Sequence, residues 1–229
     1  MDVNQFENIS KGYLENLNGS KKLLVSFGGI NQGLGIPVFE FFNSISDIDC
    51  DKIYLRDFNQ AWYQKGIDSE LDSIDRILDN LKNKLFHNNY QRVCFIGNSM
   101  GGYAAILFGT LLNVDRVVSF APQSYIDYYN RLISLDRRWS TEISCVHKFE
   151  KKKKEYFDLK KYLKKNPNYK TEISLYYSIN HRLDKKHSER LRYQKNIVLH
   201  PIEEGGHSVV KVLRNNGMLK SILKSTLVN

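Results

Sequence analysis

Six short apolar runs recur along the chain and alternate with longer segments of helical periodicity. Each run is rich in β-branched or aromatic residues, and most are continuously apolar. This pattern is typical of strands buried on both faces of a parallel sheet. The runs cover residues 22–28, 52–57, 92–97, 116–122, 172–178 and 196–202. We therefore expect about six strands, most of them parallel.

The segments between the runs have the spacing of helices. Apolar residues recur three and four positions apart in residues 67–85 and again in residues 208–223, which predicts amphipathic helices. Residues 100–112 are small and apolar, as in a helix buried on all sides. Alternation of strands and helices predicts an α/β fold with a doubly wound, mainly parallel sheet and right-handed crossovers.

One connection is much longer than a crossover requires. About fifty residues separate Pro122, at the end of the fourth run, from Glu172, at the start of the fifth, and long connections without secondary structure of their own are uncommon. We expect residues 124–168 to form a helical cap inserted into a single α/β-hydrolase-like domain that spans residues 1–229.

A glycine-flanked serine lies between the third run and the small apolar helix. The sequence Gly97-Asn98-Ser99-Met100-Gly101 is G-x-S-x-G between a strand and a helix, the context of a nucleophile elbow. The serine needs so sharp a turn that β-carbons at the two glycine positions would collide. The helix that follows directs backbone N–H groups and its positive dipole end toward a developing oxyanion. Ser99 is therefore the candidate nucleophile.

The partners of such a serine follow it in the order acid, then histidine. His207 lies in Gly205-Gly206-His207-Ser208, directly after the last run, and is the candidate general base. Asp184 is the first carboxylate after the run at 172–178 and is the candidate acid, which would orient the histidine. Asp184 also suits the N-cap of a helix, and Glu203 and Glu204 are the alternative acids.

The oxyanion hole needs two backbone donors. The Met100 N–H, directly after the serine, is one candidate. The glycine-rich loop at 27–33 supplies the other, from the N–H of Gly29 or Ile30, because glycines let the backbone approach a substrate oxygen closely. The alternative is that this loop is a flexible surface turn.

The elbow, the chain order of the three residues and the GGH sequence resemble the α/β-hydrolase superfamily over most of the chain. Phe120-Ala121-Pro122-Gln123, after the strand that follows the elbow, extends the resemblance to bacterial carbohydrate O-acetyltransferases such as the serogroup A meningococcal capsule O-acetyltransferase. This resemblance implies that acetyl-CoA acylates the serine and that a polysaccharide hydroxyl then takes the acetyl group. We expect no bound cofactor, with acetyl-CoA as the candidate acyl donor.

Two aromatic residues and a glutamine follow strands at the edge where ligands bind in open α/β sheets. Trp62 and Tyr63 offer flat faces with polar tips, which suit a sugar ring, and Gln123 lies at the same edge. The alternative is that Trp62 and Tyr63 pack over their loop and seal the domain.

Most of the net positive charge is concentrated in one segment. The formal net charge is +9, and residues 148–165 hold nine lysines against three carboxylates, a formal charge of +6. Lys151 and Lys152, within this run, are candidates for attracting an anionic polymer or the phosphates of coenzyme A. The alternative is a solvated helix face. Nucleic acid is not an expected partner because no recognition motif is present.

Other features limit the location and chemistry. No segment approaches the roughly 20 apolar residues of a membrane span, and the first ten residues lack the pattern of a secretory signal, so we expect a cytoplasmic protein. Three scattered cysteines without C-x-x-C spacing predict neither disulfides nor a metal site.

The favoured function is acyl transfer on a carbohydrate, by an O-acetyltransferase or an O-acyl esterase. A general carboxylesterase, a thioesterase or a peptidase would use the same three residues. The non-enzymatic alternative is a catalytically silent binding protein.

Overall fold

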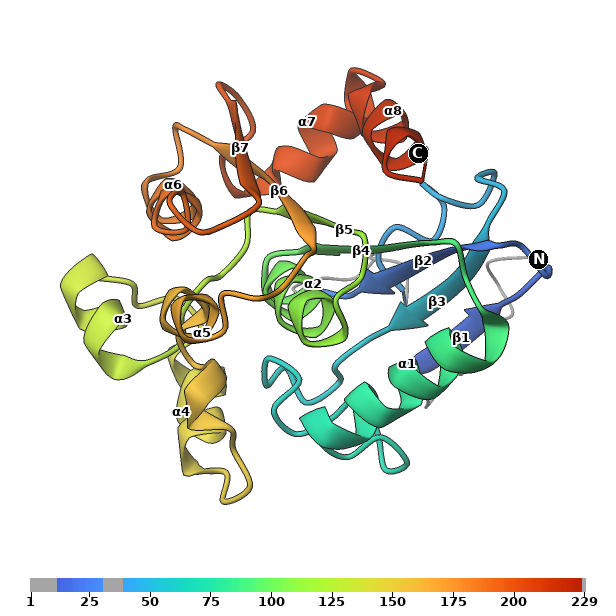
Figure 1. The fold of residues 1–229 in the computed structure, drawn as a ribbon. Coiled ribbons are helices and arrows are strands. Elements are labelled where there is room, and N and C mark those ends of the chain that lie inside the picture. Colours follow the sequence, from blue (N-terminus) through green and yellow to red (C-terminus); the bar gives the residue numbers. More distant parts are fainter. Residues whose placement is uncertain (1–11, 31–38, 228–229) are drawn as a thin grey trace.

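A seven-stranded sheet forms the centre of the molecule (Figure 1). The computed structural model describes residues 12–30 and 39–227. The strand order is β1-β3-β2-β4-β5-β6-β7, with β1 antiparallel to β3 and the other neighbours parallel. The strands are β1 (Tyr13–Asn16), β2 (Lys22–Phe27), β3 (Asp51–Leu55), β4 (Arg92–Asn98), β5 (Arg116–Phe120), β6 (Glu172–Ser178) and β7 (Ile197–Ile202).

The prediction of a doubly wound, mainly parallel α/β sheet is confirmed. Each of the six apolar runs corresponds to one of the strands β2 to β7. The additional strand, β1, is a four-residue edge strand of half-buried and exposed residues. It carries no apolar run, and none of its four residues is fully buried.

Helices cover both faces of the sheet (Figure 1). The alternating side chains of β2 point to opposite faces: Leu23 and Val25 belong to the core beneath α1 (Ile74–Asn88) and α2 (Met100–Leu112), whereas Leu24 belongs to the core beneath α7 (Val209–Asn215) and α8 (Met218–Ser225). The small residues of α2 let that helix lie close to the central strands.

Two predicted helices differ from the observed ones. Residues 67–73 form a turn, closed by a hydrogen bond from Ile67 N to Leu71 O, and α1 begins only after Ser73, whose side chain caps it. The helix expected at 208–223 is two helices, because Gly217 adopts a left-handed conformation (φ 76°) between α7 and α8. Apolar periodicity continues through both interruptions, so it could not locate them.

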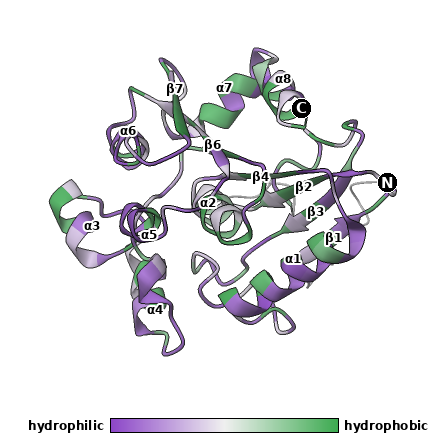
Figure 2. Ribbon diagram, viewed as in Figure 1, coloured by the Kyte–Doolittle hydropathy of each residue, from purple (hydrophilic) through white to green (hydrophobic). Residues whose placement is uncertain are grey.

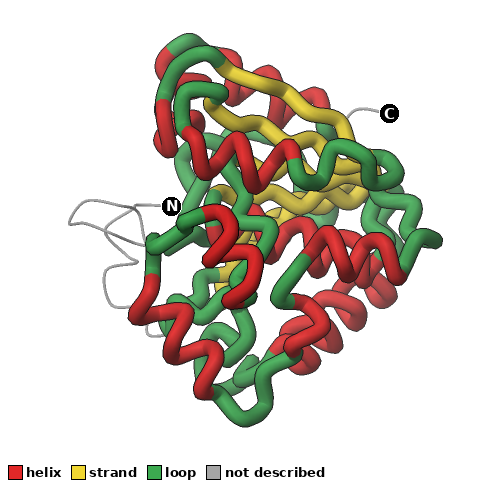
Figure 3. The backbone as a smooth tube through the Cα atoms, turned by 90° about the vertical axis from the view of Figure 1, so that its left-hand side faces the viewer, coloured by secondary structure: helices red, strands yellow, loops and turns green. Residues whose placement is uncertain are grey.

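The long connection between β5 and β6, at residues 124–168, contains helices and is called the insertion below. Its helices are α3 (Tyr128–Ser134), α4 (Ser140–Lys148), the 3-10 helix η2 (Lys154–Tyr156) and α5 (Leu159–Lys165). Figure 3 shows the side of the molecule on which they lie. The Tyr103 hydroxyl of α2 donates to the Tyr156 carbonyl of η2 over 2.7 Å, which fastens the insertion to the core.

Two elements after β6 complete the fold around the sheet edge. Helix α6 (Arg182–Glu189) follows β6, and the 3-10 helix η3 (Gly206–Ser208) follows β7. Figure 2 shows α6 as hydrophilic along its length, in contrast to the mixed surfaces of α7 and α8. Within the described residues, no helix combines the length and apolarity needed to cross a bilayer.

Candidate active site

Ser99 lies at the junction of β4 and α2 in a strained backbone conformation. Its φ of 54° and ψ of −114° are unusual for a residue with a side chain. The glycines on either side make this turn sterically possible. A β-carbon on Gly97 would lie 2.1 Å from the Gly101 oxygen, and one on Gly101 would lie 2.0 Å from the Phe27 oxygen. Only glycine fits at either position.

The backbone of Ser99 is held by hydrogen bonds, whereas its hydroxyl forms none among the described residues. Ser99 N donates to Phe120 O over 2.9 Å, and Ser99 O accepts from Tyr103 N and Gln123 N. The side-chain oxygen is buried and has no hydrogen-bond partner among the described residues. The turn therefore holds a hydroxyl in place without using it structurally.

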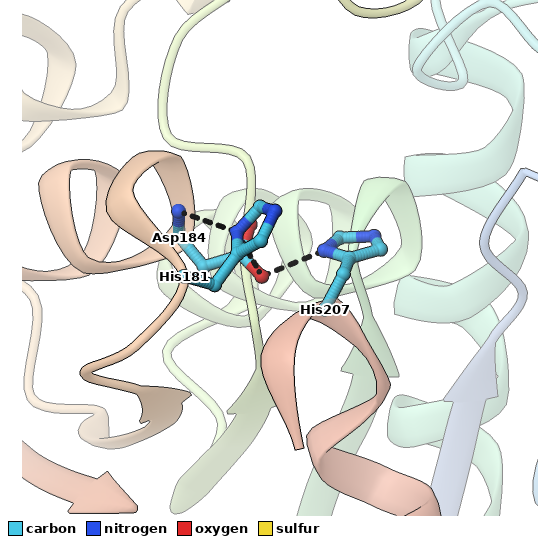
Figure 4. Close-up of side chains that lie close together, drawn as sticks. All are labelled: His181, Asp184 and His207. Carbon is cyan, nitrogen blue, oxygen red and sulfur yellow. Dashed lines mark hydrogen bonds and ion pairs between the residues drawn. The ribbon is translucent and has the colours of Figure 1, made fainter. Parts of the chain in front are cut away.

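Asp184 and His207 are brought together at the ends of β6 and β7 (Figure 4). Nδ1 of His207 lies 2.7 Å from Oδ2 of Asp184. Because an ionised carboxylate only accepts hydrogen bonds, Nδ1 carries the proton and Nε2 is left with a lone pair. Asp184 is fully buried, and the His207 side chain is about one third exposed (34%). The imidazole therefore faces a protein partner on one side and stays accessible on the other.

The alternative role of Asp184 as a helix N-cap is wrong. The N-cap of α6 is His181, whose Nδ1 accepts from Asp184 N over 3.2 Å, and Asp184 lies in the first helical turn. The carboxylate is consequently free of capping. The Ser99 hydroxyl, in contrast, makes no hydrogen bond to His207 in the described part of the chain, and this part of the expected triad stays a prediction.

Arg138 occupies the second oxygen of the candidate acid. Its Nη1 donates to Asp184 Oδ1 over 2.8 Å. Burial raises the pKa of Asp184, but the hydrogen bonds and charges of His207 and Arg138 outweigh burial and leave that pKa below its usual value. The carboxylate is therefore ionised at neutral pH. Nothing in the sequence marks Arg138, which lies in the insertion 46 positions from its partner.

The three residues in Figure 4 also have the composition of a metal site. Ligand atoms of His181, Asp184 and His207 lie within 4.8 Å of one another. A metal ion here would compete with the His207 proton for Asp184 Oδ2 and would lie near the guanidinium bound to Oδ1. This donor set fits a hydrogen-bonded acid–base pair better than it fits a cation.

The candidate oxyanion donors differ in whether their N–H groups already have a hydrogen-bond partner. Gly29 N donates to Glu40 Oε2 over 2.8 Å, so this N–H is already engaged. Met100 is the first residue of α2, whose first N–H groups have no partner within the helix. Met100 and Ile30 thus remain the better candidates, and residues 31–33 of the same loop lie outside the described residues.

Glu40 is a polar residue of this region that sequence reasoning missed. Its two carboxylate oxygens join the loop after β2 to the elbow, since Oε2 accepts from Gly29 N and Oε1 accepts from Asn98 Nδ2 over 2.9 Å. Burial raises the pKa of Glu40 to about 7, although both hydrogen bonds oppose this rise. Glu40 also interacts electrostatically with His207.

Trp62, Tyr63 and Gln123 form no surface on which a sugar ring could stack. Trp62 and Tyr63 are fully buried, and Gln123 is almost so. Trp62 Nε1 donates to Gln123 Oε1 over 2.7 Å, and the Tyr63 hydroxyl donates to Gly28 O over 3.0 Å. The expectation of substrate contact is corrected, because these side chains fold inward and hold their loop against the strand ends.

The lysines of the insertion differ in their surroundings. Lys151 is exposed, Lys152 Nζ donates to Phe149 O, and Lys153 pairs with Asp75 over 2.8 Å. Others line a cavity of about 850 Å³, whose wall includes the cations Lys154, Lys161, Lys165 and Arg190, the carboxylates Asp127, Glu155 and Asp158, and the aromatic residues Tyr129 and Tyr156.

This cavity lies beside the far end of α2. Leu111, near the last turn of the helix, is part of its wall. Twelve residues of helix separate Leu111 from Ser99, a rise of about 18 Å. Ser99, Asp184 and His207 are not part of the cavity wall.

No protein-family model matches the chain, and no curated protein matches it by sequence. Solved structures do share its fold. The capsule O-acetyltransferase of Neisseria meningitidis serogroup A is 18% identical, with a TM-score of 0.69 over 93% of this chain and 90% of that chain. A mutant of that enzyme has been solved in complex with CoA.

Two further solved structures, one from a protein complex and one of a hydrolase, share this fold. In the glycosylation-associated Gap123 complex from Streptococcus agalactiae, the match is 19% identical with a TM-score of 0.64, covering 95% of this chain but only 47% of that chain. MGS-MChE2, an α/β hydrolase from the sediment metagenome of the Mar Chica lagoon in Morocco, is 18% identical with a TM-score of 0.59, covering 96% and 97% of the two chains. The fold is therefore that of the α/β hydrolases.

Proposed function

We propose that this protein is a serine enzyme that transfers acyl groups. Within this class, we propose that it acts on a carbohydrate, as an O-acetyltransferase or as an O-acyl esterase. The observation that carries this proposal is the elbow: Ser99 has a strained backbone, a buried hydroxyl without a partner, and the N-terminus of α2 directly behind it. The Asp184–His207 pair at the ends of β6 and β7 supports it.

In the first half-reaction, Ser99 Oγ attacks the carbonyl carbon of the acyl donor while His207 Nε2 takes the hydroxyl proton. Asp184 keeps the proton on Nδ1 and stabilises the imidazolium. The N–H groups of Met100 and Ile30 receive the negative charge of the tetrahedral oxygen. The leaving group departs with the proton from His207, and the acyl group stays on Ser99 as an ester.

In the second half-reaction, a hydroxyl attacks this ester and His207 takes its proton. Collapse of the tetrahedral intermediate transfers the acyl group and returns the proton to Ser99. The enzyme is a transferase if a sugar hydroxyl attacks and an esterase if water attacks. Two similar structures, a capsule O-acetyltransferase and a glycosylation-associated complex, favour a carbohydrate acceptor, and the CoA complex favours acetyl-CoA as donor.

We further propose that the cavity lined by Lys154, Lys161 and Lys165 binds an anionic stretch of the acceptor. Lysine ammonium groups attract the charges of such a polymer, and Tyr129 and Tyr156 offer aromatic surface to its sugar rings. An acceptor that reaches from Ser99 to Leu111 in the cavity wall, a rise of about 18 Å along α2, would be several sugar units long.

The test of the proposed chemistry is labelling by a fluorophosphonate, which reacts with an activated serine. The parent protein should be labelled, and Ser99→Ala should not. Ser119→Ala is the matched control, because Ser119 Oγ is also buried and without a partner among the described residues but lies inside β5. Equal labelling of the parent and Ser99→Ala would contradict the proposal, as would loss of labelling in Ser119→Ala alone.

The substrate class is tested separately. Acetyl-CoA and an O-deacetylated acidic polysaccharide are incubated with the parent and with Ser99→Ala, and acetyl transfer is measured by NMR of the polymer. Transfer that depends on Ser99 supports the transferase. Release of free acetate alone favours the general carboxylesterase or thioesterase.

A further inference from the structure

We propose that Arg138 is a positioning residue for Asp184, through which the insertion sets the protonation behaviour of His207. This inference rests on the proposed function, since it concerns how the candidate acid works. Arg138 lies between α3 and α4 and reaches the buried carboxylate from outside the sheet. Asp184 thus has a charged partner that belongs to the insertion.

Asp136 orients the Arg138 guanidinium on the side away from Asp184. Arg138 Nε donates to Asp136 Oδ1 over 3.1 Å, and Nη2 donates to Asp136 Oδ2 over 2.9 Å. This two-pronged contact defines the plane of the guanidinium. The remaining nitrogen, Nη1, then points at Asp184 Oδ1. A lysine in the same place would supply the charge without the fork.

A buried histidine holds Asp136 in turn. His187 Nε2 lies 3.0 Å from Asp136 Oδ2, and its Nδ1 accepts from Ser124 N over 2.9 Å. The backbone donor at Nδ1 places the ring proton on Nε2, which donates to Asp136. Burial lowers the pKa of His187 to about 4, so this ring is neutral.

The contacts form one continuous chain from the end of β5 to the candidate base. It runs from Ser124 through His187, Asp136, Arg138 and Asp184 to His207. All of its side chains up to Asp184 are buried or nearly so. A movement of the insertion would therefore change the hydrogen bond between Arg138 and Asp184.

The charge of Arg138 acts on His207 in a definite direction. The groups that face His207 are Asp184 and His181 from α6 and Glu40 from the loop after β2, with Arg138 behind Asp184. The guanidinium offsets part of the negative charge that stabilises the imidazolium. Without it, Asp136 would keep Arg131, whose Nη1 lies 4.0 Å from Asp136 Oδ1, but Asp184 would have no guanidinium beside it, and the protonated ring would be favoured.

The test compares Arg138→Gln with Arg182→Gln. Arg182 is a matched control, because it also joins α6 to the insertion, donating to Ser134 O over 2.9 Å, and its replacement removes the same charge. Hydrolysis of a neutral nitrophenyl ester is measured as a function of pH. For Arg138→Gln we expect kcat to fall about tenfold to hundredfold and the acidic limb of kcat/KM to move up by about 0.5–1 pH unit. Arg182→Gln should leave the limb in place.

Two further measurements complete the experiment. Arg138→Lys should restore the acidic limb but not kcat, because it keeps the charge and loses the fork. The His207 imidazole, followed by NMR titration, should show the same upward shift in Arg138→Gln without reference to turnover. An unshifted His207 imidazole in folded Arg138→Gln would overturn the inference. A kcat in Arg138→Lys equal to that of the parent would overturn it as well. A parent protein that is neither labelled by fluorophosphonate nor active would instead overturn the proposed function.

Discussion

The Nδ1 atom of His207 lies 2.7 Å from Oδ2 of Asp184, although the two residues are 23 positions apart and belong to different elements. The contact exists because β6 and β7 are parallel neighbours whose C-terminal ends meet at one edge of the sheet. The same edge carries the turn that holds Ser99, at the end of β4. The fold therefore supplies the nucleophile, the acid and the base from the ends of β4, β6 and β7.

Replacing Asp184 should damage activity far more than replacing the other nearby acids. Asp184→Asn should lower kcat on the order of 10³- to 10⁴-fold, because an amide favours the wrong tautomer of His207. Glu203→Gln and Glu204→Gln should change kcat by less than about threefold, since both side chains are exposed. Steady-state kinetics on a nitrophenyl ester decides the matter. A severe loss in either glutamine variant, with a mild one in Asp184→Asn, would assign the acid to the wrong residue.

A single methyl group at the elbow should disrupt the site. In Gly101→Ala the new β-carbon would lie 2.0 Å from the Phe27 oxygen, so α2 or β2 must shift. We expect loss of fluorophosphonate labelling and a destabilisation of several kcal/mol, on the order of 3. Gly19→Ala is the control: it also strains a left-handed position (φ 81°) but meets no atom within 4 Å. It should cost only about 1 kcal/mol and keep full labelling.

Glu40 should make stability fall as pH rises through the neutral range. Its pKa is raised to about 7 in the folded protein, from an ordinary value of 4.5, so the native state holds its proton more tightly than the unfolded chain does. The resulting stabilisation is full below about pH 4.5 and is lost as pH rises through 7. We compare the free energy of unfolding of the parent and Glu40→Gln by urea titration at several pH values. The difference between them should move against the parent by about 3 kcal/mol between pH 4.5 and 7.5, and a constant difference would show that Glu40 titrates normally.

The two sides of α5 should respond differently to an anionic acceptor. Lys161 and Lys165 line the cavity of the insertion, whereas Lys160 and Lys164 lie on the same helix and are not part of the cavity wall. The double variants K161Q/K165Q and K160Q/K164Q remove the same charge. Only the first should raise KM for an acidic polysaccharide, by about fivefold or more at low salt, and the effect should shrink as added salt screens the lysines. Equal changes in both variants would mean that the lysines act only as a solvated charged surface.

The fold was largely predictable from sequence because its strands are buried on both faces. Runs such as residues 92–97 are continuously apolar for that reason. The glycines around Ser99 indicate a sharp turn, because no other residue type fits at their positions. Asp184 and His207 could be predicted as partners because the fold fixes the order of acid and histidine along the chain. Their contact then follows from the strand order.

What escaped prediction depends on contacts between distant segments. Arg138 and Asp184 are 46 positions apart, and Glu40 and Asn98 are 58 apart, with no local pattern at either partner. The inward folding of Trp62 depends on Gln123, 61 positions away. Local chemistry at Trp62 suited a surface platform equally well, and only the tertiary packing decides against it.

The most direct test of the account is the identity of the residue that carries the acyl group. The parent protein and Ser99→Ala are mixed with nitrophenyl acetate or acetyl-CoA, quenched with acid and digested, and the peptides are analysed by mass spectrometry. We predict the added mass of one acetyl group on Ser99 in the parent and no such adduct on the corresponding peptide of Ser99→Ala. Rapid turnover with acetyl on a different residue, or turnover that persists undiminished in Ser99→Ala, would contradict the account.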